Sequence, residues 1–519
     1  MLTVAGLYLG WFHLTQGPPT QRVHIRWAPT VTAVERDRIE REAGLVDGVP
    51  FEDRTWQYFL RDRSRANIHR LITHPGVEDT FHIDRGTDRV QLDRPNLSPQ
   101  FRQWLESDQL GRISLAILLL AVSISVWLRQ PIVRGLREGL GVIGTVFVAN
   151  TAIFTMGFQA FIANSGGVDI DSHLKFARRL DLLHLPAPHF LFELLVRMFA
   201  AAGMSYEHAA AVILGLCYGI MAVLIARELD HRSLLTWRRA SLLIPAVLLA
   251  SHMFWFTIAS HDVYLNYLVP IAYHNPTQQL VKVFAIGIMF LFLPTFVAGR
   301  AITWRTSSII GVLCVLSTIA KPSFLIAFLP AVALWETRSL LRLPWTPLLR
   351  FTATVVVPCA FVLLWQARIA YGSDAAARIA YGVDAASSVV IAPFSAIDPA
   401  QIPMRFSMSL AFPIVVALAA VRTRTWNARM AFVWVFLAVA IVMSLLLTET
   451  GRLDEGNFMW TGQTAVFVAY VESMLFLVST PLGRGWKRLS WTVFAGHVMC
   501  GVLWYGLLFT TRWHDFTRL

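Results

Sequence analysis

Long apolar runs alternate with short polar segments along most of this chain. Residues 242–258, 283–299 and 431–447 are clear examples, and none of them contains an aspartate, glutamate, lysine or arginine. An α-helix rises about 1.5 Å per residue and the hydrocarbon core of a bilayer is about 30 Å thick, so runs near 20 residues suit a helix that crosses the membrane. A soluble protein can bury one such run but not a long series. The pattern therefore predicts a helical membrane protein.

Counted in this way, the apolar runs predict about 13 transmembrane helices. With the first residue on the cytoplasmic side, each cluster of three or more basic residues in a short loop falls on that same side, as the positive-inside rule requires. The apolar stretch 190–202 is not counted, because it carries Glu193 and Arg197 and would reverse all later loops. We expect it to form an amphipathic helix in the outer interface. The expected spans are residues 2–14, 113–128, 139–161, 212–224, 242–258, 280–297, 309–320, 324–334, 352–365, 406–421, 431–447, 465–478 and 491–508.

The same pattern divides the chain into four parts. We expect residues 1–20 to form an N-terminal membrane anchor, because the segment lacks the basic amino end and the small-residue cleavage site of a signal peptide, which is the alternative. Residues 21–110 are expected to form a water-soluble α+β domain on the outer side. Residues 111–138 hold the second span and a cytoplasmic loop. Residues 139–519 form the multi-span membrane domain, with an outer loop at 162–206.

The soluble part shows strand and helix signals in alternation. Strands are expected at 23–27, 55–60, 77–83 and 90–92, and helices at 30–44 and 64–73; Thr32 and Glu35 form a capping box at the start of the first helix. This order is typical of a small ferredoxin-like sandwich. The segment Ile72-Thr73-His74-Pro75-Gly76-Val77-Glu78 also resembles the propeptide-type inhibitor modules of subtilisin-like proteases. The expected role is docking of a protein partner or substrate, with a purely structural role as the alternative.

Composition and charge exclude several classes of function. Hydrophobic residues make up 55% of the 519 positions and charged residues only 15%, against about 25% in soluble domains. The net charge of +12 lies in short loops rather than along one face, so no nucleic acid partner is expected. Walker and dinucleotide-binding motifs are absent from the sequence, which argues against a cytoplasmic nucleotide site. The four cysteines lie in apolar runs and are expected to be small buried hydrophobic residues.

The segment after the third expected span carries the clearest candidate chemistry. It reads Gly166-Gly167-Val168-Asp169-Ile170-Asp171-Ser172-His173. Asp169, Asp171 and His173 would suit a divalent cation such as Mg²⁺ or Mn²⁺, held mainly through oxygen ligands. Either carboxylate would equally suit the role of general base. Short acidic loops on an outer face are also common without any function, so the residues alone leave these alternatives open.

A family resemblance adds to this. An outward loop with an early acidic residue, followed by membrane-surface helices, resembles the GT-C superfamily of integral-membrane glycosyltransferases. Two further segments look like bacterial members of that group, namely His274-Asn275-Pro276-Thr277-Gln278-Gln279 and Ala320-Lys321-Pro322-Ser323-Phe324. The resemblance implies a polyprenyl-phosphate sugar donor, a catalytic aspartate at Asp169 or Asp171, and a bacterial inner membrane with a periplasmic active face. The two spans and the soluble domain before residue 139 depart from the family pattern, in which the catalytic loop follows the first span.

Several basic and histidine side chains are candidates for binding the lipid-linked phosphate. Lys321 would face the outer interface, where an ammonium can pair with a phosphate, although snorkelling to water would also explain its position. Arg452 could hold a phosphate bidentately or pair with the neighbouring acids. The complete set of expected phosphate-binding residues is Lys321, His173, His189, His274 and Arg452.

Three functions follow from the sequence. The first is a membrane glycosyltransferase that moves a sugar from a polyprenyl-phosphate carrier to an acceptor on the periplasmic face. The alternative is a non-catalytic membrane scaffold that docks partners through residues 21–110. The third is a transporter, which is disfavoured because few charged residues lie within the expected spans; Glu472 is the clearest of them, and the sequence does not identify its partner.

Overall fold

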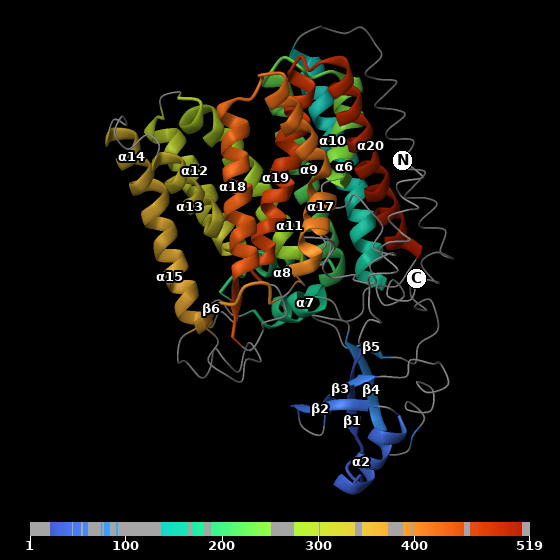
Figure 1. The fold of residues 1–519 in the computed structure, drawn as a ribbon. Coiled ribbons are helices and arrows are strands. Elements are labelled where there is room, and N and C mark those ends of the chain that lie inside the picture. The colour runs from blue at the N-terminus through green and yellow to red at the C-terminus, as the bar shows by residue number, and fades with distance from the viewer. Residues whose placement is uncertain are drawn as a thin grey trace.

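The structure, a computed structural model, contains a bundle of helices and a separate small sheet (Figure 1). It describes residues 21–43, 45–52, 55–60, 74, 77–83, 90–91, 136–164, 169–180, 188–250, 275–299, 302–337, 345–371, 388–395, 397, 399–450 and 457–510.

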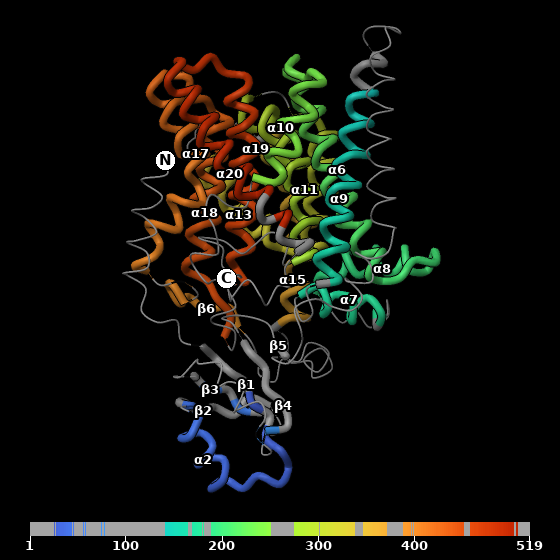
Figure 2. The backbone as a smooth tube through the Cα atoms, turned by 90° about the vertical axis from the view of Figure 1, so that its right-hand side faces the viewer, coloured from blue at the N-terminus to red at the C-terminus, as the bar shows by residue number. Residues whose placement is uncertain are grey.

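The helices of the bundle follow the apolar runs of the sequence. The long ones lie side by side and are nearly parallel or antiparallel to one another (Figures 1 and 2). Their bounds are α6 Leu136–Asn164, α7 Asp169–Arg179, α8 Leu191–Ala201, α9 Tyr206–His231, α10 Trp237–Ala250, α11 Pro276–Phe292, α12 Trp304–Ala320, α13 Ser323–Thr337, α14 Trp345–Phe351, α15 Val357–Tyr371, α17 Ile402–Arg422, α18 Ala428–Leu446, α19 Met459–Ser479 and α20 Arg484–Thr510. Short π-helical turns, η2 Leu293–Val297 and η3 Thr352–Val356, extend α11 and join α14 to α15.

Seven helices among the described residues are long and apolar enough to cross a membrane. They are α6, α9, α11 with η2, α14 to α15 through η3, α17, α18 and α19, while α12 and α13 are shorter apolar helices. These seven helices are consistent with a multi-pass helical membrane protein. The expected count of about 13 spans stays a prediction, because the first two lie outside the described residues and α10, α12, α13 and α20 are not among the seven.

Helix α19 is the central element of the bundle. Each of its residues from Met459 to Leu477 is buried, whereas the peripheral α15 exposes large apolar side chains such as Phe361 and Leu364. Exposed apolar side chains on outer helices are expected where lipid rather than water surrounds the protein. A helix that is buried on every side must instead find partners for its polar residues within the protein. The polar side chains of α19 are therefore the ones to examine for function.

Helices α6 and α9 approach closely because α9 carries glycines one turn apart. A Cβ atom built on Gly215 would lie 1.9 Å from Oγ1 of Thr155 and 2.7 Å from the carbonyl oxygen of Thr151. A Cβ atom on Gly219 would lie 2.0 Å from Oγ1 of Thr151. Small residues at this spacing let two backbones pack closely within a membrane. The glycines thus fix α9 against α6, the helix that precedes α7 in the chain.

We expect Gly215→Ala to destabilise the protein by about 1–3 kcal/mol, because the added methyl group overpacks a contact with backbone. The measurement is the unfolding midpoint of the purified protein in detergent. Gly144→Ala on α6 is the matched control, since no atom lies within 4 Å of the added Cβ. Equal stability of the two variants would contradict the close packing of α6 against α9.

The small sheet has five strands, all paired antiparallel, in the order β2-β3-β1-β4-β5. The strands are β1 Gln21–Trp27, β2 Leu45–Glu52, β3 Thr55–Leu60, β4 Val77–Ile83 and β5 Val90–Gln91, and the helix α2 spans Ala33–Glu42. The side chain of Thr32 accepts a hydrogen bond from the backbone nitrogen of Glu35 at 3.3 Å, so the N-cap lies where the sequence predicts it. The expected helix at 64–73 lies outside the described residues.

Strand β2 is absent from the sequence prediction. Its segment contains Gly48 and Pro50, both depleted in strands, and the pairing with β3 shifts register near each of them. Proline is tolerated here because β2 is an edge strand and needs no hydrogen bond from that nitrogen on its open side. In the core of this domain, Trp27 donates to the Tyr58 hydroxyl at 3.2 Å, and Tyr58 donates to Glu40 at 2.5 Å. Burial and that carboxylate raise the pKa of Tyr58 above its ordinary value.

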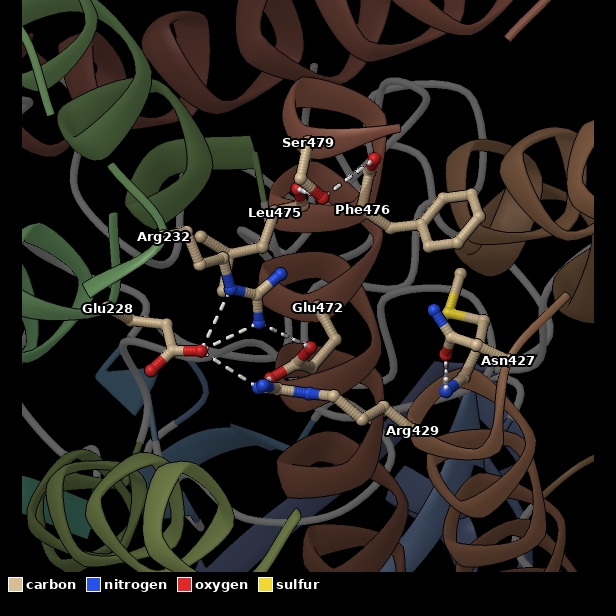
Figure 3. Close-up of polar contacts among 9 residues, drawn as sticks. Glu228, Arg232, Asn427, Arg429, Glu472, Leu475, Phe476 and Ser479 are labelled. Atoms are coloured by element: carbon tan, nitrogen blue, oxygen red, sulfur yellow. Dashed lines mark hydrogen bonds and ion pairs between the residues drawn. The ribbon is translucent and has the colours of Figure 1, made fainter. Parts of the chain in front are cut away.

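Helices α7 and α8 and the sheet lie at one end of the bundle (Figures 1 and 2). Figure 3 shows a network of four charged side chains that joins the C-terminal end of α9 to α18 and α19. Glu228 accepts from Arg429 at 2.9 Å and pairs with Arg232 at 2.8 Å. Glu472 pairs with Arg429 at 3.1 Å and with Arg232 at 3.5 Å. The structure thus supplies the partners of Glu472 that the sequence does not identify.

Candidate functional site

The site is built around Asp169, which the first turn of α7 holds against the start of α11. Nδ2 of Asn275 donates a hydrogen bond to Oδ2 of Asp169 at 2.8 Å. Asn275 is itself fixed as the N-cap of α11, since its Oδ1 accepts from the backbone nitrogen of Gln278 at 3.2 Å and from the Thr277 hydroxyl at 2.6 Å. An N-cap residue satisfies a free backbone donor of the first helical turn. One asparagine therefore caps α11 and positions the carboxylate of α7.

Lys321 stands at the link between α12 and α13, and Pro322 follows it. Its Nζ lies 4.8 Å from the centre of the Trp460 ring, at the start of α19. Burial lowers the pKa of Lys321 to about 8, and the carboxylates of Asp169, Glu449 and Glu193 act in the opposite direction. The lysine therefore keeps its charge at neutral pH and loses it near pH 8. The structure brings Lys321 and Asp169 to the same end of the bundle.

His189 precedes α8 and lies within electrostatic range of both of these groups. Burial lowers the pKa of His189 to about 3; the charges of Lys321 and His173 lower it further, and the Asp169 carboxylate raises it. The imidazole is consequently neutral at physiological pH. A neutral histidine can accept a hydrogen bond or donate one, but it adds no positive charge toward a phosphate. This limits the role predicted for His189 to hydrogen bonding.

His173 and Glu193 join the two short helices α7 and α8. Nδ1 of His173 shares a hydrogen bond with Oε1 of Glu193, and both side chains are buried. Oε2 of Glu193 has no hydrogen-bond partner among the described residues. Glu193 therefore faces α7, and the position of α8 in the outer membrane interface stays a prediction. The hydrogen bond holds the first turn of α7 in place relative to α8.

The divalent cation predicted at Asp169, Asp171 and His173 does not fit this geometry. The sequence suggests a loop, but residues 169 to 173 are the first turn and a half of α7. Each residue of an α-helix turns by about 100°, so side chains two apart point away from each other. Asp169 engages Asn275, and His173 engages Glu193. Within the described ranges, no three histidine, cysteine, aspartate or glutamate side chains are grouped to hold a metal ion.

Two of the predicted phosphate-binding residues, His274 and Arg452, lie outside the described residues. On either side of the stretch that contains Arg452, Asn457 and Glu449 are described, and Nδ2 of Asn457 donates to Oε2 of Glu449 at 2.9 Å. Glu449 ends the short strand β7 Leu447–Glu449, which pairs with β6 Val389–Ile391. Glu449 lies close enough to Lys321 for its carboxylate to influence the charge of that lysine.

Gln278 and Ser323 belong to the two segments named in the sequence analysis but were not among its candidate site residues, and they form hydrogen bonds beside the site. Nε2 of Gln278 donates to the carbonyl oxygen of Trp460 at 2.8 Å and to Oγ1 of Thr464. Oγ of Ser323 donates to Oε1 of Gln278 at 2.9 Å. One glutamine thus connects α11, α13 and α19. The local signal for this helix start is Asn275-Pro276, because asparagine at the N-cap and proline at the first helical position mark the beginning of a helix.

No family model matches this chain, and no curated protein matches its sequence. The chemistry of the site therefore follows from its own residues. They provide the Asp169 carboxylate held by an asparagine, the Lys321 ammonium over an indole ring, and the neutral imidazole of His189. Such a set can accept a proton at the carboxylate and bind an anion at the ammonium.

Proposed function

We propose that this protein is a membrane glycosyltransferase of the GT-C type. It transfers a sugar from a polyprenyl-phosphate carrier to an acceptor hydroxyl at the end of the bundle that carries α7 and α8. The observation that carries this proposal is the placement of Lys321 within electrostatic range of Asp169, although the two residues belong to helices far apart in sequence. A base and a cation near each other suit a reaction in which a hydroxyl loses a proton while a phosphate leaves.

In the proposed reaction, the acceptor oxygen attacks the anomeric carbon of the sugar. The bond between that carbon and the phosphate oxygen breaks, and its electron pair leaves with the polyprenyl phosphate. The proton of the acceptor hydroxyl passes to the Asp169 carboxylate, which Asn275 orients. Lys321 stabilises the negative charge that develops on the departing phosphate, since a positive charge aimed at the leaving group lowers the barrier.

The surroundings of the site support a substrate that comes from the lipid. Helices α7 and α8 have 11 residues each and are too short to span a bilayer. They cover the end of the bundle at which Lys321 stands, so a phosphate at the membrane surface could reach the ammonium while its chain stays in lipid. We place this end on the periplasmic face of a bacterial inner membrane. The domain of residues 21–110 is proposed to dock the acceptor or a protein partner, and its strand order supports a ferredoxin-like fold.

The test is transfer by the purified full-length chain reconstituted in vesicles. Polyprenyl-phosphate carriers with different radiolabelled sugars are supplied, and label is followed into membrane lipid and added glycan acceptors. Transfer that requires Asp169 supports the proposal. Retention of all label on the carrier, in a protein that still binds it, would favour the non-catalytic scaffold that docks partners through residues 21–110.

The charge on Lys321 leads to a pH-dependence of carrier binding. Its lowered pKa means that the ammonium is present below pH 8 and lost as the pH rises through about 8. We expect affinity for a short prenyl phosphate to fall about tenfold or more at alkaline pH, the contribution of one charge-assisted hydrogen bond. Binding is measured by titration calorimetry between pH 6.5 and 9.5.

Lys321→Arg serves as the control for this prediction, because a guanidinium stays protonated throughout that range. Its affinity should not fall above pH 8. Lys321→Met should bind weakly at every pH. A decline that persists in the arginine variant would assign the pH-dependence to another group.

A further inference from the structure

The break between α12 and α13 leaves two backbone carbonyl groups without helical partners. In a continuous helix, the carbonyl oxygens of Thr318 and Ile319 would each accept from the backbone nitrogen four residues later. For the first of them that position is Pro322, which has no N–H, and the extended backbone of Lys321 has already ended the helix. The last carbonyl groups of a helix need donors from outside it. Other parts of the protein must therefore supply them here.

Both donors come from elements far away in the sequence. Nε2 of Gln366, on α15, donates to the carbonyl oxygen of Thr318 at 2.7 Å. The backbone nitrogen of Phe190, just before α8, donates to the carbonyl oxygen of Ile319 at 3.2 Å. The other hydrogen on Nε2 of Gln366 goes to the carbonyl oxygen of Pro188 at 2.8 Å. The end of α12 is thus joined to the segment before α8 on both sides of one residue.

The residue between these two attachments is His189. The segment is held a third time, because the ring of Phe190 packs edge-on against Trp365 of α15, with 6.2 Å between the ring centres. His189 keeps part of its surface exposed, and no hydrogen bond within the described part of the chain occupies its ring nitrogens. Its backbone is therefore fixed, while its imidazole is free to bind a ligand.

The same attachments place the imidazole beside Lys321. The backbone nitrogen that follows His189 meets Ile319, only two residues before the lysine. The charges of Lys321 and Asp169 both act on the imidazole, which agrees with this placement. A neutral imidazole carries one N–H, so it can donate a hydrogen bond to the anion that the ammonium attracts.

We propose that Gln366 is a positioning residue that holds His189 beside Lys321, so that the imidazole N–H donates to the lipid-linked phosphate. Gln366 does not touch the ligand itself, because it is 4% exposed and both hydrogens of its amide nitrogen are used. The inference rests on the proposed function for the identity of the phosphate. It adds to the site a residue of α15, a helix that holds none of the candidate residues of the sequence.

The test is a double-mutant cycle on the binding of farnesyl phosphate to the purified full-length protein, measured by titration calorimetry in detergent. His189→Phe removes the N–H and should weaken binding about tenfold, the contribution of one hydrogen bond to a charged group. Gln366→Met keeps the length of the side chain but donates nothing, and we expect a loss of about fivefold. The double variant should bind no more weakly than His189→Phe alone, because Gln366 acts through the imidazole.

Ser307→Ala is the matched control. It removes the hydrogen bond of 2.6 Å between Ser307 and Thr354, which joins α12 to the turn η3 that leads into α15. That bond lies about 20 Å along α12 from Lys321, so its loss should leave the affinity unchanged. Farnesol, which has the chain without the phosphate, should not distinguish the variants. If Gln366→Met does not fold, Trp365→Leu loosens the same segment and takes its place.

Each outcome has a defined meaning. A loss in Gln366→Met that disappears in the His189→Phe background supports the inference. Losses that multiply in the double variant, an equal loss in Ser307→Ala, or no binding of farnesyl phosphate would overturn it. The transfer assay separates it from the proposed function. Coupled binding without any sugar transfer leaves Gln366 as a positioning residue and removes the transferase, whereas transfer that requires Asp169 without this coupling does the reverse.

Discussion

Replacing Asp169 with asparagine is expected to lower sugar transfer by about 10²- to 10⁴-fold, the range associated with loss of a general base. The asparagine keeps the size of the side chain and can still bond to Asn275, but it cannot take the proton of the acceptor hydroxyl. Carrier binding should change little, because Lys321 remains. The measurement is the rate of transfer in vesicles, together with the affinity for a prenyl phosphate.

Two matched variants sharpen this experiment. Asp171→Asn removes the other carboxylate that the sequence offers as a base, and we expect a much smaller loss, since α7 turns residue 171 away from the face on which Asp169 meets Asn275. Asp230→Asn changes an exposed carboxylate near the end of α9 and should not affect the rate. A large loss in Asp171→Asn with full activity in Asp169→Asn would reverse the assignment of the base.

Replacing Glu472 with leucine is expected to destabilise the protein by about 3–5 kcal/mol, the cost of removing one partner from a buried ion pair. Glu472 is 4% exposed and pairs with Arg429 and Arg232. Without it, two guanidinium groups share the single carboxylate of Glu228 (Figure 3). The measurement is the free energy of unfolding of the purified protein in mixed detergent.

Charge balance, rather than size, should determine this effect. The double variant Glu472→Leu with Arg429→Met leaves the pair Arg232 and Glu228 intact, and we expect it to recover most of the lost stability. Glu207→Gln, which breaks the half-exposed pair with Arg178, is the control and should cost at most about 1 kcal/mol. If the double variant were less stable than Glu472→Leu alone, the network would not act through its charge balance.

The sequence by itself determined the helical, membrane-spanning character of the bundle, because the length of an apolar run is a local property. It also determined the first part of the sheet domain, where Thr32 and Glu35 mark a helix start through contacts three residues apart. It did not reveal strand β2, since the glycine and proline that disfavour a strand are tolerated only at an edge, and the edge is defined by strands elsewhere in the chain.

The sequence also predicts which loops lie on the same side of the membrane, since basic loops orient the spans. The sequence therefore expects Asp169 and Lys321 on one side. It could not choose between Asp169 and Asp171, because that choice depends on the helical phase of α7 and on Asn275, more than 100 residues away. For the same reason the sequence left a metal site open at Asp169, Asp171 and His173, although the helix turns Asp171 away from the face that carries the other two.

Only the tertiary structure decided which buried polar groups meet. Glu472 acquires its arginines from α18 and α9, and Gln366 of α15 donates to the carbonyl oxygens of Pro188 and Thr318. Each of these arrangements depends on how helices are rotated and shifted against one another. Hydropathy fixes that a helix crosses the membrane, but a run that is apolar on nearly all sides leaves its rotation to packing. The fold class was therefore a property of the sequence, and the site a property of the packed bundle.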